Sequence, residues 1–305
     1  MSNKYVYSFV MLLLIGVLLF GGTKLYLQSN GEKNRQEAQI TVVTSFYPVY
    51  IAVENIIGQE EGVILCNLSE PQTGCLHDFQ LTPEDMKLLD SADVFVINGG
   101  GAESFLADVM KRYPELTVID ATKELAEVEE EEDILMHAWM NTGLYEQEIK
   151  AILQGLCEIC PDKQEAFSDN AAVYLKKVED LSAQMKELSE QLDQRSVILF
   201  SEAYEGLAKQ LGLQVVYLLD LDEERQLSSG EVAEVMAAIE NQPDSFVIAE
   251  ELYGSDMGEL VNKQTGIPVL YLNTITRGTY EKDSYLVAMQ NNIDVLKELV
   301  DHETD

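Results

Sequence analysis

The stretch that decides the fold is residues 38–68, AQITVVTSFYPVYIAVENIIGQEEGVILCNL. Its first eight residues are apolar and rich in β-branched side chains, which is typical of a buried strand. Apolar residues then recur at helical spacing over 47–57, and the segment 62–68 has the composition of a second strand. A strand, a helix and a strand in this order indicate a βαβ unit with a parallel sheet.

The same alternation continues along the chain and then starts again after a long helix. In the first half we expect helices over 82–90 and 102–111 and strands over 94–98 and 117–120. Thr82, Pro83 and Asp85 form a capping-box signal for the first of these helices. In the second half we expect strands over 196–200, 214–218, 246–249 and 268–272, and helices over 203–211, 229–241, 256–265 and 284–300.

The two α/β series are separated by a helical pattern that runs from about residue 163 to residue 192. Thirty helical residues would extend ~45 Å, which suits a spine that serves two lobes; a two-stranded coiled coil is the alternative. The predicted fold class is therefore α/β, with two parallel-sheet lobes joined by one long central helix. The predicted boundaries are 38–160 for the first lobe, 161–195 for the linking helix and 196–305 for the second lobe.

Residues 1–37 differ in kind from the rest. Tyr5–Thr23 carries no charge and is flanked by Lys4 and Lys24, so as a helix it would span ~30 Å, about one hydrocarbon core. It is either a signal peptide or an uncleaved anchor. No cysteine follows it for acylation, and we favour an N-terminal anchor helix that holds the remainder at the extracellular face of the membrane.

The net charge of −34 is far from that of an ordinary domain. Such an acidic surface repels phosphate backbones, which excludes nucleic acid as a partner. It also raises the local concentration of cations, although solubility alone is an equally simple explanation.

The four cysteines are candidates for disulfides, because export permits them. Cys66 and Cys75 could close a short loop. Cys157 and Cys160 form a Cys-x-x-Cys pair at the predicted end of a helix rather than after a strand. A structural disulfide is the favoured interpretation of that pair, and a thioredoxin-like redox site is the alternative.

Two histidines lie in segments where an α/β protein builds sites. His77 follows a predicted strand and precedes the helix that begins after Thr82, and His137 follows the acidic run 127–133. Ligands of parallel sheets bind at the carboxyl ends of the strands. Carboxylates also occur at such ends, in Ser201-Glu202 and in Glu250-Glu251.

Histidine together with carboxylate is a ligand set typical of Zn²⁺ and Mn²⁺. The oxygen-rich loop that Ca²⁺ requires is absent from the sequence. The sequence also lacks the Gly-x-Ser-x-Gly and phosphate-loop motifs of common enzymes. The two histidines are therefore candidates for a shared metal site, with surface or core histidines as the alternative, and we predict no enzyme.

Several motifs together resemble the metal-binding receptor family of zinc and manganese ABC importers, from about residue 42 to residue 300. The resemblance rests on His77-Asp78-Phe79-Gln80-Leu81-Thr82-Pro83, Asn98-Gly99-Gly100-Gly101-Ala102-Glu103, His137-Ala138-Trp139-Met140, Ser201-Glu202-Ala203-Tyr204 and Thr265-Gly266-Ile267-Pro268-Val269. The first of these motifs is the most specific. The long central helix is also a feature of that family.

The resemblance implies a set of metal ligands. His77 and His137 fall on the first two ligand positions of the family. The third falls on Ser201 or Glu202, of which we favour Glu202, and the fourth falls on Asn273 where the family usually has Asp. Asp78 and Glu250 are further candidates for supporting or alternative ligands.

The resemblance also implies a function: an exported receptor that binds Zn²⁺ or Mn²⁺ in the cleft between lobes and delivers it to an ABC permease and its ATPase. Two alternatives remain at this point. One is a receptor-like adaptor that has lost metal binding, because Ser201 and Asn273 depart from the family pattern. The other is an exported thiol oxidoreductase that uses Cys157 and Cys160.

Overall fold

A computed structural model describes residues 39–69, 79–127, 132–221 and 227–304. The anchor helix predicted for residues 5–23 lies outside the described residues, as does the rest of segment 1–37. No helix in the described ranges combines the length and the apolar character needed to cross a membrane. Residues from Thr41 onward form one compact unit.

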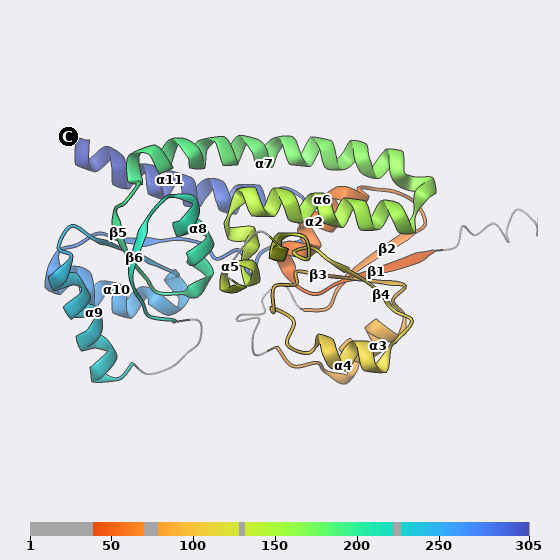
Figure 1. The fold of residues 1–305 in the computed structure, drawn as a ribbon, viewed down its shortest axis with the longest axis horizontal. Helices are drawn as coiled ribbons and strands as arrows, with labels where there is room; N and C mark the ends of the chain where they lie inside the picture. Colours follow the sequence, from red (N-terminus) through yellow and green to blue (C-terminus); the bar gives the residue numbers. More distant parts are fainter. Residues whose placement is uncertain (1–38, 70–78, 128–131, 222–226, 305) are drawn as a thin grey trace, which may run out of the picture. The chain divides into compact units, whose positions relative to one another are not determined.

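The first sheet confirms the βαβ interpretation of residues 38–68. Its four strands are arranged in the order β2-β1-β3-β4 (Figure 1). The strands β1 and β3 run parallel with Val43 opposite Phe95, and β3 and β4 run parallel with Phe95 opposite Val118. The bounds are β1 Ile40–Thr44, β2 Val63–Asn67, β3 Val94–Ile97 and β4 Thr117–Asp120.

The helices of this half follow the predicted order, with one shifted start. They are α2 Tyr47–Ile57, α3 Pro83–Asp90 and α4 Leu106–Arg112. The capping box of α3 is present: Thr82 N–H donates to Asp85 Oδ2 at 2.7 Å, and Asp85 N–H donates to Thr82 Oγ1 at 3.2 Å. The helix α4 starts four residues later than expected because residues 98–103 form a tight turn with three glycines at positive φ.

A group of short helices follows β4 and was predicted only in part. It contains η1 Leu125–Glu127, α5 Glu132–Met136, η2 Ala138–Met140 and the longer α6 Thr142–Ile159. We expected α6 but not α5, because the acidic composition of 127–133 indicates a polar loop. The local sequence does not predict this short helix. In the structure it packs against α8 (Glu205–Gln210) and η4 (Glu202–Tyr204), which lie far along the chain.

The long helix is α7, Gln164–Leu192, which follows the short η3 Pro161–Lys163. Its 29 residues extend about 43 Å. The helix packs against α2, α6 and α11 (Ser284–Thr304), as Figure 1 shows. Its apolar face is therefore covered within the chain, which leaves none for the coiled-coil alternative. The buried residues of this face are Phe167, Ala171, Tyr174, Val178, Leu181, Met185, Leu188 and Leu192.

The second sheet repeats the topology of the first, in the order β6-β5-β7-β8, and each neighbouring pair is parallel. Its strands are β5 Ser196–Leu199, β6 Gln214–Leu218, β7 Phe246–Ala249 and β8 Val269–Tyr271. The remaining helices are α9 Ser229–Asn241 and α10 Glu251–Thr265. The predicted fold class, two parallel-sheet α/β lobes with a long helix between them, is thus confirmed for the described residues.

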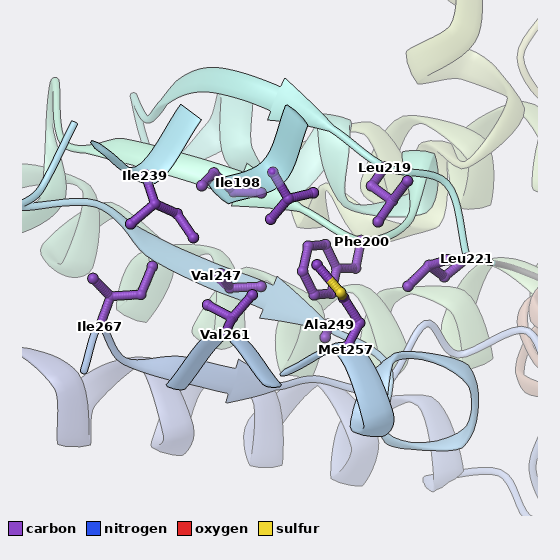
Figure 2. Packing of buried hydrophobic residues seen from close by; sticks show 11 residues of the cluster. Ile198, Phe200, Leu219, Leu221, Ile239, Val247, Ala249, Met257, Val261 and Ile267 are labelled. Carbon is purple, nitrogen blue, oxygen red and sulfur yellow. The ribbon is translucent and has the colours of Figure 1, made fainter. Parts of the chain in front are cut away.

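The core of the second lobe lies between its sheet and the helices α9 and α10. Phe200, Val247 and Ala249 come from the strands or their ends, and Ile239 and Val261 come from the helices (Figure 2). All five side chains are at most 3% exposed. This packing holds the carboxyl ends of β5, β7 and β8 in place, and the candidate site residues follow these ends directly.

The Cys157–Cys160 disulfide is not formed in the structure, which corrects that prediction: both are free thiols. The Cys157 thiol hydrogen-bonds with Ser168 of α7, and Cys160 is buried at the end of α6. Burial raises the pKa of both thiols, which is the opposite of what a redox nucleophile needs. Cys66 is also a free thiol, and Cys75, its predicted partner, lies outside the described residues.

Candidate metal-binding site

His137 occupies a buried and tightly held position between α5 and η2. It is 5% exposed, and its backbone N–H donates to Ile134 O at 3.2 Å. Its own carbonyl accepts from Met140 N–H at 2.9 Å. The imidazole stands edge-on to the Trp139 ring, with 5.3 Å between ring centroids and 65° between planes. The ring orientation is therefore set by packing before any ligand arrives.

The glycine-rich turn after β3 holds the segment that leads to His137. The Asn98 side-chain amide donates to Leu135 O at 3.0 Å and to Met136 O at 3.3 Å. These are the last carbonyls of α5, and such carbonyls have no partner within a helix. Gly100 has φ +58°, and a Cβ there would lie 2.6 Å from the carbonyl carbon of Leu135. Only glycine permits this close approach.

Glu103 closes the same turn from within. Its carboxylate accepts from the Asn98 N–H at 2.8 Å and from the Gly99 N–H at 3.0 Å. Burial raises the pKa of Glu103 to about 7, although the two backbone donors act in the opposite direction. The motif at residues 98–103 thus positions His137, a role that its sequence alone did not reveal.

Ser201 and Glu202 lie at the carboxyl end of β5. Ser201 is 5% exposed, and its Oγ accepts from Ala203 N–H at 3.3 Å. Glu202 is half-buried, and its backbone N–H donates to Asp220 Oδ1 at 3.3 Å. Because α5 packs against both η4 and α8, the segment before His137 and the segment of Ser201 and Glu202 are in contact.

Asn273 follows β8, where we predicted the fourth ligand. Its side chain is exposed, and its Oδ1 accepts from Ile275 N–H at 2.7 Å. Asn292 of α11 holds its backbone, accepting from Asn273 N–H at 2.7 Å and donating to Asn273 O at 2.8 Å. The Asn273 oxygen thus has one lone pair left for another partner. Asn273 and Glu250 line a common surface cavity of about 730 Å³.

The loop after β8 is also tied to the His137 segment. Trp139 Nε1 donates to the carbonyl of Thr274 at 2.9 Å, and both groups are buried. Thr274 Oγ1 in turn donates to Glu250 Oε1 at 3.2 Å. Arg277 approaches the same carboxylate oxygen at 3.5 Å. Sequence analysis identified Glu250 but missed the connecting roles of Trp139, Thr274 and Arg277.

The structure thus brings together three segments that carry candidate ligands: the loop of His137, the end of β5 and the loop after β8. His77 and Asp78 lie outside the described residues. Within the described ranges, no group of three or more His, Cys, Asp or Glu side chains is arranged to hold a metal ion. The candidate site is therefore a partial ligand set around His137.

Comparisons with known proteins identify the family. The family described as zinc-uptake complex component A, periplasmic (ZnuA), matches residues 42–299. The chain is 25% identical over 291 residues to the high-affinity zinc uptake system protein ZnuA of Bacillus subtilis, covering 88% of this chain and 90% of that protein. It is 24% identical over 312 residues to the zinc-binding lipoprotein AdcA of Streptococcus pneumoniae, covering 95% of this chain but only 61% of AdcA.

The fold is shared with solved substrate-binding proteins. The structure of FpvC from Pseudomonas aeruginosa in complex with Mn²⁺ superposes with a TM-score of 0.74 at 20% sequence identity, over 87% of this chain and 99% of that one. The family match spans nearly all of the chain after the N-terminal segment. The chain therefore belongs to the ZnuA family of zinc-uptake complex components.

Proposed function

We propose that this chain is a receptor that binds Zn²⁺ or Mn²⁺ and delivers it to an ABC permease and its ATPase. The observation that carries the proposal is the buried, pre-oriented imidazole of His137, whose loop contacts the segment at the end of β5 and the loop after β8. Relatives named for zinc binding and a neighbour solved with Mn²⁺ support the choice of cargo.

The proposed ligands are His77, His137 and Glu202, with Asn273 or water completing the shell. Two imidazoles and one carboxylate suit a borderline cation such as Zn²⁺. The imidazoles must be neutral to bind, so affinity falls below pH ~6. The net charge of −34 attracts the cation to the protein but does not select it.

We place the receptor at the extracellular face of the membrane, held there by the hydrophobic segment 5–23. AdcA is named a lipoprotein, which supports a surface location for this family. In this chain no cysteine precedes Cys66, so a spanning helix takes the place of an acyl chain in the proposal.

The test is cation titration of the full chain in detergent, purified without metal and followed with a competing fluorescent chelator. The wild type is expected to bind one equivalent, and His77→Ala and His137→Ala are each expected to weaken binding about 100-fold or more. His302→Ala removes the remaining histidine and serves as the matched control. Absence of binding by the wild type, or unchanged affinity in both variants, contradicts the proposal.

A second pair of variants assigns the third ligand. Glu202→Ala weakens binding if the carboxylate is the ligand, while Ser201→Ala then has a small effect. The reverse result transfers the role to Ser201. The half-buried side chain of Glu202, with its stronger donor group, supports the first outcome.

A further inference from the structure

Glu250 is a carboxylate at the edge of the proposed site that is not used as a helix cap. It is the N-cap residue of α10, yet its side chain makes no capping hydrogen bond. Its Oε1 instead accepts from Thr274 Oγ1 at 3.2 Å and lies 3.5 Å from Arg277 Nη2. The side chain is only 14% exposed, so its charge is poorly screened by water.

Arg277 is held beside this carboxylate by packing rather than by a network of hydrogen bonds. Its guanidinium carbon lies 5.3 Å from the centre of the Tyr253 ring. The side chain is 20% exposed, and its buried Nε has no hydrogen-bond partner among the described residues. Its contribution at this place is therefore mainly its positive charge, which arginine keeps at every physiological pH.

The Glu250–Arg277 pair is connected to both proposed ligand segments. On one side Glu250 is linked through Thr274 to Trp139, whose ring packs on His137. On the other side, burial raises the pKa of the Tyr204 hydroxyl, two residues after Glu202, and the charges of Glu250 and Arg277 act on that pKa in opposite directions. Glu250 also lines the cavity that Asn273 lines. An uncommitted carboxylate here would be a further oxygen donor beside Asn273, the proposed fourth ligand.

We infer that Arg277 is a specificity-determining residue: by pairing with Glu250 it withholds that carboxylate from the bound cation and favours Zn²⁺ over Mn²⁺. The inference rests on the proposed function. Zn²⁺ is satisfied by four ligands rich in nitrogen, whereas Mn²⁺ gains more from additional carboxylate oxygens. A fixed guanidinium also repels any divalent ion that approaches Glu250.

The test compares the dissociation constants for Zn²⁺ and Mn²⁺ of the full chain in detergent. Arg277→Gln is expected to tighten Mn²⁺ binding about tenfold and to change Zn²⁺ binding much less, because the released Glu250 carboxylate is an oxygen ligand that favours Mn²⁺. The double variant Arg277→Gln/Glu250→Gln is expected to restore the wild-type preference. Lys263→Gln, which removes an exposed positive charge elsewhere on α10, is the control for net charge.

Two further variants keep the inference falsifiable if Arg277→Gln folds poorly. Arg277→Lys retains the charge and is expected to retain the preference for Zn²⁺. Glu250→Gln in the wild-type background is expected to leave the ratio of the Mn²⁺ and Zn²⁺ dissociation constants unchanged, since the paired carboxylate is no ligand and the loss of its charge acts on both ions alike. A loss of Mn²⁺ binding without a matching loss of Zn²⁺ binding in Glu250→Gln, or an equal shift in Arg277→Lys and Arg277→Gln, overturns the inference.

The outcome also separates this inference from the proposed function. If the wild type binds Zn²⁺ and the ratio of the two dissociation constants is the same in Arg277→Gln, only the role of Arg277 is overturned. If the wild type binds neither ion, the receptor function and the role of Arg277 both fail.

Discussion

The indole N–H of Trp139 donates a hydrogen bond of 2.9 Å to the carbonyl oxygen of Thr274, 135 residues later in the chain. The carbonyl oxygen of the same tryptophan accepts a second hydrogen bond, from the Tyr285 hydroxyl at 2.8 Å. Both bonds are buried, and both join the His137 segment to the C-terminal part of the chain. The orientation of the His137 ring thus depends on residues from the second lobe and α11.

Replacing Trp139 by Phe removes the donor to Thr274 and leaves a buried carbonyl without this partner. We expect the free energy of unfolding to fall by about 1–3 kcal/mol, and cation affinity to fall with it. Urea unfolding and cation titration measure the two effects.

Tyr217→Phe is the matched control, because it removes the exposed hydrogen bond to Glu234. Its effect on unfolding should be within about 0.5 kcal/mol. Equal effects of the two substitutions on unfolding would show that the buried Trp139–Thr274 hydrogen bond contributes no more stability than the exposed one.

Gly100→Ala tests the turn that supports α5. A methyl group there would lie 2.6 Å from Leu135 backbone, at a residue whose φ is +58°. We expect a loss of about 1–3 kcal/mol in stability, together with weaker cation binding, because α5 must shift and His137 with it.

Gly230→Ala in α9 is the comparison for this substitution. An added Cβ at Gly230 meets only Ser228 Oγ at 3.7 Å, and the residue lies in the first turn of a helix. Alanine should there be neutral or stabilising by up to about 1 kcal/mol. A stable Gly100→Ala protein with normal affinity would refute the positioning role of the turn.

The buried carboxyl groups of the first lobe predict how stability changes with pH. Burial raises the pKa of Glu103 to about 7, and raises that of Glu148 well above its ordinary value, with the charges of Glu103 and Asp120 adding to the effect. An acid whose pKa is raised on folding binds its proton more tightly in the native state. The stability that these carboxyl groups contribute is therefore greatest below the ordinary pKa of 4.5, and it declines as pH rises through 7.

Glu148→Gln removes one of these acids while keeping its shape. We expect higher stability than the wild type at pH 8 and a flatter decline as pH rises above the ordinary carboxyl pKa of 4.5, measured by thermal unfolding. Glu158→Gln, at an exposed position of the same helix, should change neither quantity appreciably. A steeper decline in Glu148→Gln would contradict the assignment.

The repeated strand–helix order could be predicted from sequence because it depends on local periodicity. The long helix was predicted to within one residue of its observed bounds, since its buried positions recur at steps of three or four. The helix α10 begins at Glu251, five residues before its predicted start, and the side chain of its N-cap residue Glu250 makes no capping hydrogen bond but contacts Thr274 and Arg277. No local signal contains that information.

Part of the candidate site could also be predicted from sequence, and part could not. His137 was recognisable from its place in a motif, and its burial beside Trp139 fits a ligand role. The hydrogen bond from Asn98 to Leu135 joins residues 37 positions apart, and the one from Trp139 to Thr274 joins residues 135 positions apart. Such pairs carry no periodicity, so only a three-dimensional structure reveals that they position the histidine.

The helix α11 has a consequence for how the molecule folds. It packs on α7, α2 and β8, and its Tyr285 ring stacks on Tyr145 at 4.0 Å between centroids. These contacts join segments that are far apart in the sequence. Contacts of large sequence separation form late in folding. The surroundings of His137 should therefore mature last, after α11 has docked. Until then the Tyr145 ring of α6 lacks its stacking partner, and apolar groups left uncovered during folding favour aggregation.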